Sequence, residues 1–305
     1  MAGTGRRIRV RGLVQGVGFR PHVWRLAREA GVDGLSGMAA ETVSQGLTWL
    51  RPLLGHGRAE LRGYLRTRGL AWVEDPSNED PHYERVKARR ALAALAPLGI
   101  EAGTLARVSA QLAESRAALE AQVAALVGAH ARIEAGDVLI EAGALAAAPV
   151  EIRRRVLSQA LRFVASAEYA PRRAALARLL GDIAAARRAT VHGCLVQPGK
   201  GQVRITREFN ALADIRSPAP GVWDGRWRLE GPEREGLEIR ALGPGGLAQC
   251  PDPRACGLPR ATLLASPAVW DGDHLVAAPL AGVGGNWRAE IFAPQNSPFA
   301  RMISH

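Results

Sequence analysis

The sequence is poor in cysteine, lysine and long apolar runs. Only three cysteines occur, Cys194, Cys250 and Cys256, and none belongs to a CxxC pair, which argues against a disulfide scaffold, a zinc site or another metal site. No window of about 18 apolar residues is found. The basic N-terminus also has no apolar segment behind it, so we expect a cytoplasmic protein without a membrane partner.

Lysine is rare although the chain is basic. The 40 Lys+Arg residues outnumber the 29 Asp+Glu residues and give a net charge of +11, yet Lys87 and Lys200 are the only lysines. A GC-rich coding sequence would explain the use of arginine in place of lysine, but it does not explain the net charge. An excess of positive charge favours a polyanionic partner such as RNA, because phosphate neutralisation releases counterions.

Composition and periodicity predict an α+β fold. The 305 residues, 47% hydrophobic and 23% charged, have the composition of a folded protein with room for two or three domains. In the body of the chain, apolar spacing predicts a helix at 58–68 and a short strand at 72–74. Further helices are predicted at 85–97, 104–127, 150–165 and 171–187, so we expect the section from 85 to 187 to be entirely helical.

The periodicity changes after Ala189. Alternating apolar residues in 190–196 and 202–206 flank a glycine-rich turn and predict a hairpin. The segment 216–221 is rich in proline and is predicted to be a linker. Short apolar stretches separated by Pro and Gly predict a small β-rich C-terminal domain at 222–305.

A glycine-rich turn lies near the N-terminus, directly before a predicted helix that begins at Pro21. Backbone N–H groups of Gly16, Val17 and Gly18, with Arg20 beside them, form a candidate site for a phosphate or carboxylate. The run Val14-Gln-Gly-Val-Gly-Phe-Arg20 resembles the acylphosphatase signature. In that family the arginine is the catalytic residue that holds the acyl phosphate, a role the resemblance gives to Arg20.

The acylphosphatase resemblance extends over only one strand, one loop and one helix. Phe19-Arg-Pro-His-Val-Trp-Arg-Leu-Ala27 also resembles the acylphosphatase-like start of hydrogenase-maturation carbamoyltransferases. Met38 stands where that family has the asparagine that positions water. We therefore expect 1–34 to be a partial acylphosphatase-like segment without a complete scaffold, and a hydrolase acting through Arg20 remains the alternative function.

Motifs in the body of the chain resemble a different family. Trp49-Leu-Arg-Pro-Leu-Leu54, Glu74-Asp-Pro-Ser-Asn78 and Arg85-Val-Lys-Ala-Arg89 resemble the end of the catalytic domain of bacterial tRNA(Ile)-lysidine synthase. Leu258-Pro-Arg-Ala-Thr-Leu-Leu264 and Val269-Trp-Asp-Gly-Asp-His-Leu-Val-Ala277 resemble its C-terminal domain. By this resemblance, 35–97 is a remnant of the ATP-dependent domain, 98–215 a helical tRNA-contacting domain with a hairpin, and 222–305 the C-terminal domain.

The resemblance also implies a reaction and its cofactors. The family uses ATP and Mg²⁺ to activate a cytidine in the anticodon of isoleucine tRNA, and a lysine amine then displaces AMP. ATP binding uses a Ser-Gly-Gly-x-Asp-Ser loop, which the sequence does not contain. We therefore expect the N-terminal segment to replace the ATP domain and the chain to bind neither cofactor.

Three outcomes stay open for a chain without that loop. The protein is limited to tRNA binding or inactive, a separate chain supplies the ATP domain, or the chain is a non-functional product of gene fusion.

Three basic clusters are the candidate tRNA contacts. The alternative for each cluster is a solvated helix face without a binding role. Contacts of such residues with the RNA backbone position the RNA without reading its sequence. The clusters comprise Arg85, Lys87, Arg89, Arg90, Arg153, Arg154, Arg155, Arg172 and Arg173.

Other chemical groups have a functional and a structural interpretation. Glu74 and Asp75 are either a carboxylate pair or, as strand neighbours point to opposite faces, part of a turn. His192 and Cys194 are either a reactive pair or part of a packed hairpin. Four tryptophans are either base-stacking platforms or core residues. These are Trp223, Trp227, Trp270 and Trp287.

Overall fold

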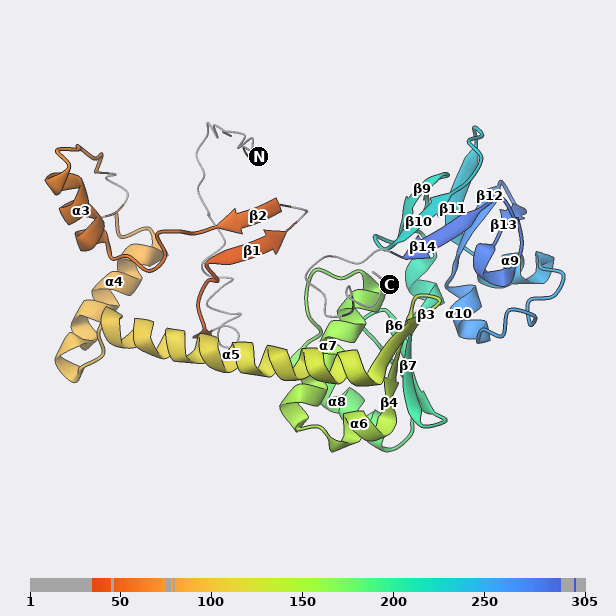
Figure 1. Cartoon of the computed structure of the whole chain (residues 1–305), viewed down its shortest axis with the longest axis horizontal. Coiled ribbons are helices and arrows are strands. Elements are labelled where there is room, and N and C mark those ends of the chain that lie inside the picture. Colours follow the sequence, from red (N-terminus) through yellow and green to blue (C-terminus); the bar gives the residue numbers. More distant parts are fainter. Residues whose placement is uncertain (1–34, 45–46, 75–77, 79, 292–298, 300–305) are drawn as a thin grey trace. The chain divides into compact units, whose positions relative to one another are not determined.

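A computed structural model describes residues 35–44, 47–74, 78, 80–291 and 299 (Figure 1). The predictions for residues 1–34, including the glycine-rich turn and Arg20, fall outside these residues. The chain divides into two compact units, Met1–Ala118 and Leu119–His305, and each is considered by itself. Helix α5 (Ala102–His130) begins in the first unit and ends in the second.

The described part of the first unit consists of a hairpin and helices. Strands β1 (Glu41–Ser44) and β2 (Leu47–Leu50) pair antiparallel, with Thr42 opposite Trp49. Helices α3 (Arg58–Thr67) and α4 (Glu84–Leu95) confirm two helices predicted from apolar spacing, and the 3-10 helix η2 (Ala96–Leu98) follows. The prediction of a strand at 72–74 is wrong, since these residues have no regular secondary structure.

A five-stranded antiparallel sheet of order β3-β4-β7-β6-β5 lies in the second unit. Its strands are β3 (Ala131–Glu134), β4 (Asp137–Glu141), β5 (Ala189–Val191), β6 (Cys194–Gly199) and β7 (Gln202–Arg207). The hairpin β6–β7 confirms the predicted one. The expectation of an entirely helical section up to 187 is wrong, because positive φ angles at Ala135 (48°) and Gly136 (83°) turn β3 back into β4.

Helices cover this sheet and form the main core with it. They are α6 (Ala142–Ala147), α7 (Val150–Ala165) and α8 (Arg173–Ala184), and α7 contacts β4, β6 and β7. The buried face of α7, with Val156 and Leu161, packs with Ile140 and Ile205 of the sheet. The last two helices confirm the predictions for 150–165 and 171–187.

The C-terminal part of the second unit is β-rich, as predicted. It contains sheets of order β13-β12-β11-β8 and β14-β10-β9. The elements are η3 (Phe209–Leu212), β8 (Ser217–Pro218), β9 (Gly221–Trp223), β10 (Trp227–Glu230), β11 (Leu237–Ala241), α9 (Gly243–Gln249), α10 (Arg260–Leu264), β12 (Pro267–Asp271), β13 (His274–Ala277), η4 (Pro279–Ala281) and β14 (Arg288–Ile291). The prediction of a linker at 216–221 is wrong, since Ser217 of β8 pairs with Ile239 of β11 in an antiparallel sheet. The whole is an α+β fold, as expected.

Candidate nucleic-acid interface

The first basic cluster lies on α4 in the first unit. Lys87, Arg89 and Arg90 are exposed, and Arg85 belongs to the first turn of the same helix. Val86 is 5% exposed, so it anchors this helix while the side chains of Lys87, Arg89 and Arg90 remain on its surface. An exposed cluster on one helix is suited to the phosphates of a nucleic acid.

The second cluster lies at the start of α7 and is largely engaged by an acidic neighbour. Glu151 accepts hydrogen bonds from Arg154 and, at 2.9 Å, from Nε of Arg155. The side chains of Arg154 and Arg155 are only 17% and 10% exposed. Burial raises the pKa of the Glu151 carboxyl, but the two guanidinium groups outweigh burial and hold that pKa below its ordinary value. Glu151 therefore neutralises part of this cluster.

The third cluster lies at the start of α8. Arg172 precedes the helix, Arg173 is its first residue, and both are exposed, whereas the neighbouring Pro171 is buried and holds the chain in place. Arg178 is a further exposed arginine of α8. Arg178 is not among the predicted contacts, because it stands alone among Ala and Leu in the sequence.

Several other arginines are buried in a charge network and are not surface contacts. Arg207 donates to both carboxylate oxygens of Asp224, at 3.1 and 3.2 Å, and Arg226 donates to the same carboxylate at 3.4 Å. Arg226 also donates to the carbonyl oxygen of Gly136 at 2.6 Å. These contacts connect the turn after β9 with β7 and with the β3–β4 turn. Part of the positive charge therefore stabilises the second unit.

The four tryptophans are core residues. Trp223, Trp227, Trp270 and Trp287 are 1%, 3%, 5% and 7% exposed. Trp223 also donates its indole hydrogen to the carbonyl oxygen of Ile215 at 3.0 Å. Base stacking on these rings is therefore excluded in this conformation, and the core interpretation is confirmed.

The remaining candidate groups are structural as well. His192 has a φ of 57° in the turn before β6, and its ring lies 3.1 Å from the carbonyl oxygen of Tyr169. Burial raises the pKa of the Cys194 thiol to about 12, so it is not a nucleophile. Glu74 accepts hydrogen bonds from Arg58, at 2.8 Å, and from the indole of Trp72, at 2.6 Å. Asp75 lies outside the described residues.

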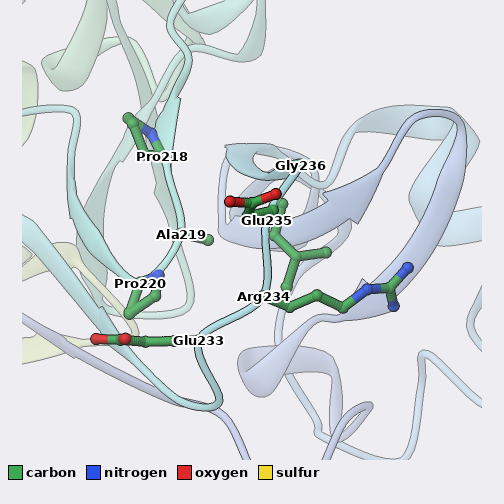
Figure 2. Close-up of a pocket in the computed structure, with 8 residues that line it drawn as sticks. Pro218, Ala219, Pro220, Glu233, Arg234, Glu235 and Gly236 are labelled. Carbon is green, nitrogen blue, oxygen red and sulfur yellow. The ribbon is translucent and has the colours of Figure 1, made fainter.

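The described residues contain no cluster of candidate metal ligands. Over the placed ranges, no group of three or more His, Cys, Asp or Glu side chains could hold a metal ion. A hollow of about 410 Å³ between β8 and β11 is drawn in Figure 2. There Arg234 is directed away from the Pro220 side, and it pairs with Asp271. The charge of Arg234 at this hollow is therefore already compensated.

A second hollow of about 490 Å³ includes Arg216 and Arg240. Both arginines are paired with Glu238, at 2.8 and 3.4 Å, so their charge is already compensated.

No single helix among the described residues is long and apolar enough to cross a membrane. The segments Val86–Leu98 and Ala102–His130, which are bent by 97° relative to each other, would be long and apolar enough only when taken together.

Comparison with known proteins identifies a family. Residues 22–96 match the model of the PP-loop domain. The chain is 45% identical over 281 residues to tRNA(Ile)-lysidine synthase of Ruegeria pomeroyi, covering 92% of this chain and 67% of the relative. It is 33% identical to the enzyme of Brucella canis, covering 83% and 59%, and 30% identical to that of Anaplasma marginale, covering 67% and 46%. The chain thus spans roughly half to two thirds of these relatives.

These matches leave one prediction without support and correct another in part. They give no support to an acylphosphatase-like segment, nor to the hydrolase acting through Arg20 that it implied; the PP-loop match begins at residue 22, inside that segment. The prediction that the whole ATP domain is replaced is wrong in part, because residues 22–96 match a PP-loop domain. The resemblance found in the body of the chain is confirmed by the relatives, and the chain belongs to the tRNA(Ile)-lysidine synthase family.

Proposed function

We propose that the chain binds isoleucine tRNA as part of a tRNA(Ile)-lysidine synthase, whose reaction attaches lysine to the anticodon cytidine with ATP and Mg²⁺. The observation that carries the proposal is the 45% identity to the Ruegeria pomeroyi enzyme over 92% of this chain. In this proposal 35–97 belongs to the PP-loop portion, 98–215 contacts tRNA and 222–305 is the C-terminal domain. The location is the cytoplasm, where tRNA is modified.

The proposed tRNA contacts are the exposed basic residues of two helices. Lys87, Arg89 and Arg90 on α4 and Arg172 and Arg173 at the start of α8 support the proposal by their exposure. Arg153, Arg154 and Arg155 contribute less, because Glu151 compensates two of them. Contacts of this kind bind the phosphate backbone and depend strongly on salt.

Fluorescence anisotropy with labelled isoleucine tRNA tests the proposal. We expect a dissociation constant in the micromolar range or below and a steep loss of affinity with salt. The double variant Arg172→Ala/Arg173→Ala should reduce the slope of log affinity against log salt by about 1.5, since each lost phosphate contact removes roughly 0.7 to 0.9.

The control replaces exposed cations outside the clusters. Lys200→Ala/Arg254→Ala removes the same charge from a hairpin turn and from a loop, and it should leave the slope almost unchanged. Equal effects of the two double variants would show that only net charge matters. Binding that does not change with salt would reject the phosphate contacts altogether.

A further inference from the structure

Three arginines form a row along one side of helix α3. Arg58, Arg62 and Arg66 are spaced by four residues, and residues at that spacing are neighbours on the surface of a helix. The side chains of Arg58 and Arg62 are 45% and 33% exposed, and Arg66 is exposed too. The row is not among the predicted tRNA contacts, because its arginines are not adjacent in the sequence.

The indole ring of Trp72 lies against this row. The guanidinium carbons of Arg62 and Arg66 are 5.9 and 5.5 Å from the centre of the ring, a distance at which a cation is attracted to an indole. Trp72 is half-buried, and among the described residues no further aromatic or cationic side chain contacts its ring. The accessible part of the ring is therefore left for another flat group.

Glu74 joins the arginine row and the indole into one group. Its carboxylate accepts hydrogen bonds from Arg58, at 2.8 Å, from Arg62, and from the indole N–H of Trp72, at 2.6 Å. We call these five residues, with Arg66, the α3 cluster. One carboxylate faces three guanidinium groups, and within the placed part of the chain Arg66 has no carboxylate partner. The α3 cluster therefore keeps a net positive charge beside a flat ring.

This combination fits an unpaired strand of RNA. Phosphates follow one another along such a strand and bind arginines, while an unpaired base has a flat face that stacks on an indole. A duplex has the phosphates, but its bases are stacked on one another inside the helix. An acidic side chain has the negative charge without the flat face.

We infer that the α3 cluster binds an unpaired segment of RNA. One base stacks on Trp72, and the neighbouring phosphates bind Arg66 and Arg58. Glu74 is a positioning residue, because it holds the indole and two guanidinium groups. The inference deepens the proposed function and rests on it for RNA as the partner.

Binding of short RNAs to the full chain tests the inference. The probes are a fluorescein-labelled single-stranded RNA of about eight nucleotides and the same strand without its bases, so that only ribose and phosphate remain. Stacking of one base on an aromatic ring contributes about 5- to 150-fold to affinity. The intact strand should therefore bind the original chain more tightly than the abasic strand by a factor in that range.

Substitutions in the α3 cluster separate stacking from charge. Trp72→Ala should abolish the preference for the intact strand, whereas Trp72→Phe keeps a ring and should retain most of the preference. Arg66→Ala should lower the slope of log affinity against log salt by about 0.7, because one phosphate contact is lost. Circular dichroism shows whether each variant keeps its helix content.

Matched controls lie outside the α3 cluster. Trp49→Ala removes a tryptophan of β2 that is 55% exposed, and it should leave the preference for the intact strand unchanged. Lys200→Ala removes one exposed cation from the β6–β7 turn, and it should leave the salt slope unchanged.

Three results would overturn the inference. The original chain could bind both strands equally, or the Trp72→Ala variant could keep its preference for the intact strand. A poly-glutamate peptide could also displace the intact strand as effectively as unlabelled RNA of the same charge, which would make an acidic polypeptide the occupant. Binding of isoleucine tRNA is measured separately with the Arg172/Arg173 variant, so a failure of the α3 cluster and a failure of the proposed function are distinguishable.

Discussion

Thr262 of α10 donates its hydroxyl hydrogen to Oδ2 of Asp137 on β4 at 2.6 Å, although 125 residues separate them. The same oxygen accepts hydrogen bonds from Thr206, at 3.0 Å, and Arg204, at 2.8 Å. Burial raises the pKa of the Asp137 carboxyl, and the three donors counteract that rise. One buried carboxylate thereby connects the five-stranded sheet with the C-terminal part of the second unit.

We expect Thr262→Val to destabilise this connection. The substitution keeps the shape of the side chain but removes one donor to a buried, charged acceptor, which costs about 1.5 to 3 kcal/mol of unfolding free energy. Urea denaturation followed by circular dichroism measures the difference. Thr190→Val on the exposed side of β5 is the control and should change stability by less than about 0.5 kcal/mol. Equal midpoints for both variants would contradict the role of Thr262.

Asp224→Asn should have a larger effect. The carboxylate of Asp224 faces Arg207 and Arg226, which are both buried, so its neutralisation leaves two buried cations without an anion. Removal of one partner from a buried pair costs about 3 to 5 kcal/mol. Asp271→Asn disrupts a solvent-exposed pair with Arg234 and should cost less than about 1 kcal/mol. Thermal denaturation of the two variants compares them directly.

Local patterns in the sequence predicted the helices well, because apolar spacing is a local signal. Helices α3, α4, α7 and α8 and the hairpin β6–β7 follow from it. The hairpin β3–β4 was missed, since its apolar residues follow a long helix and its partner β7 lies more than 60 residues further along the chain. Pairing between strands that lie so far apart in the sequence produces no local periodicity from which the pairing could be predicted.

The candidate interface was predictable only in part. Runs of basic residues located the exposed arginines of α4 and α8, but they also included Arg154 and Arg155, which are ion-paired. Glu151 precedes these two by three and four residues, a spacing that brings side chains together on a helix and could have revealed the pairing. The partners of Arg207 and Arg226 could not be foreseen, because folding brings them together.

Glu151→Gln tests the contribution of the α7 cluster to tRNA binding. Loss of the carboxylate leaves Arg154 and Arg155 without their anion, so we expect isoleucine tRNA to bind a few-fold more tightly and with a steeper salt dependence. Glu235→Gln removes an equal charge from an exposed position near β11 and should change neither quantity. Unchanged affinity in the Glu151 variant would exclude this cluster from the interface.

The same variant carries a pH prediction. The pKa of Glu151 lies below its ordinary value of 4.5 in the folded chain, because Arg154 and Arg155 outweigh burial. Such a carboxylate stabilises the fold above pH 4.5, and this stabilisation is lost as the pH falls through the lowered pKa. The original chain should therefore lose more stability on acidification than Glu151→Gln, as measured by denaturation at a series of pH values.

Alanine substitutions at two glycines with the same φ angle distinguish the effect of backbone strain from that of steric overlap. Gly136 and Gly236 both have a φ of 83°. An added Cβ at Gly236 meets nothing within 4 Å, whereas at Gly136 it would lie 2.5 Å from Cζ2 of Trp227 and 3.0 Å from Cδ1 of Ile291. Both alanine variants suffer the strain of the left-handed region, roughly 1 to 2 kcal/mol. Only Gly136→Ala also forces the Trp227 ring to move.

We therefore expect Gly136→Ala to be less stable than Gly236→Ala by a further 1 to 3 kcal/mol or so, the usual range for an overpacked core. Urea denaturation gives the two values, and the fluorescence of the tryptophans reports whether the ring environment changes only in the Gly136 variant. Equal losses of stability would mean that the β3–β4 turn does not pack tightly on Trp227. The contact between this turn and β10 would then contribute nothing to the cohesion of the second unit.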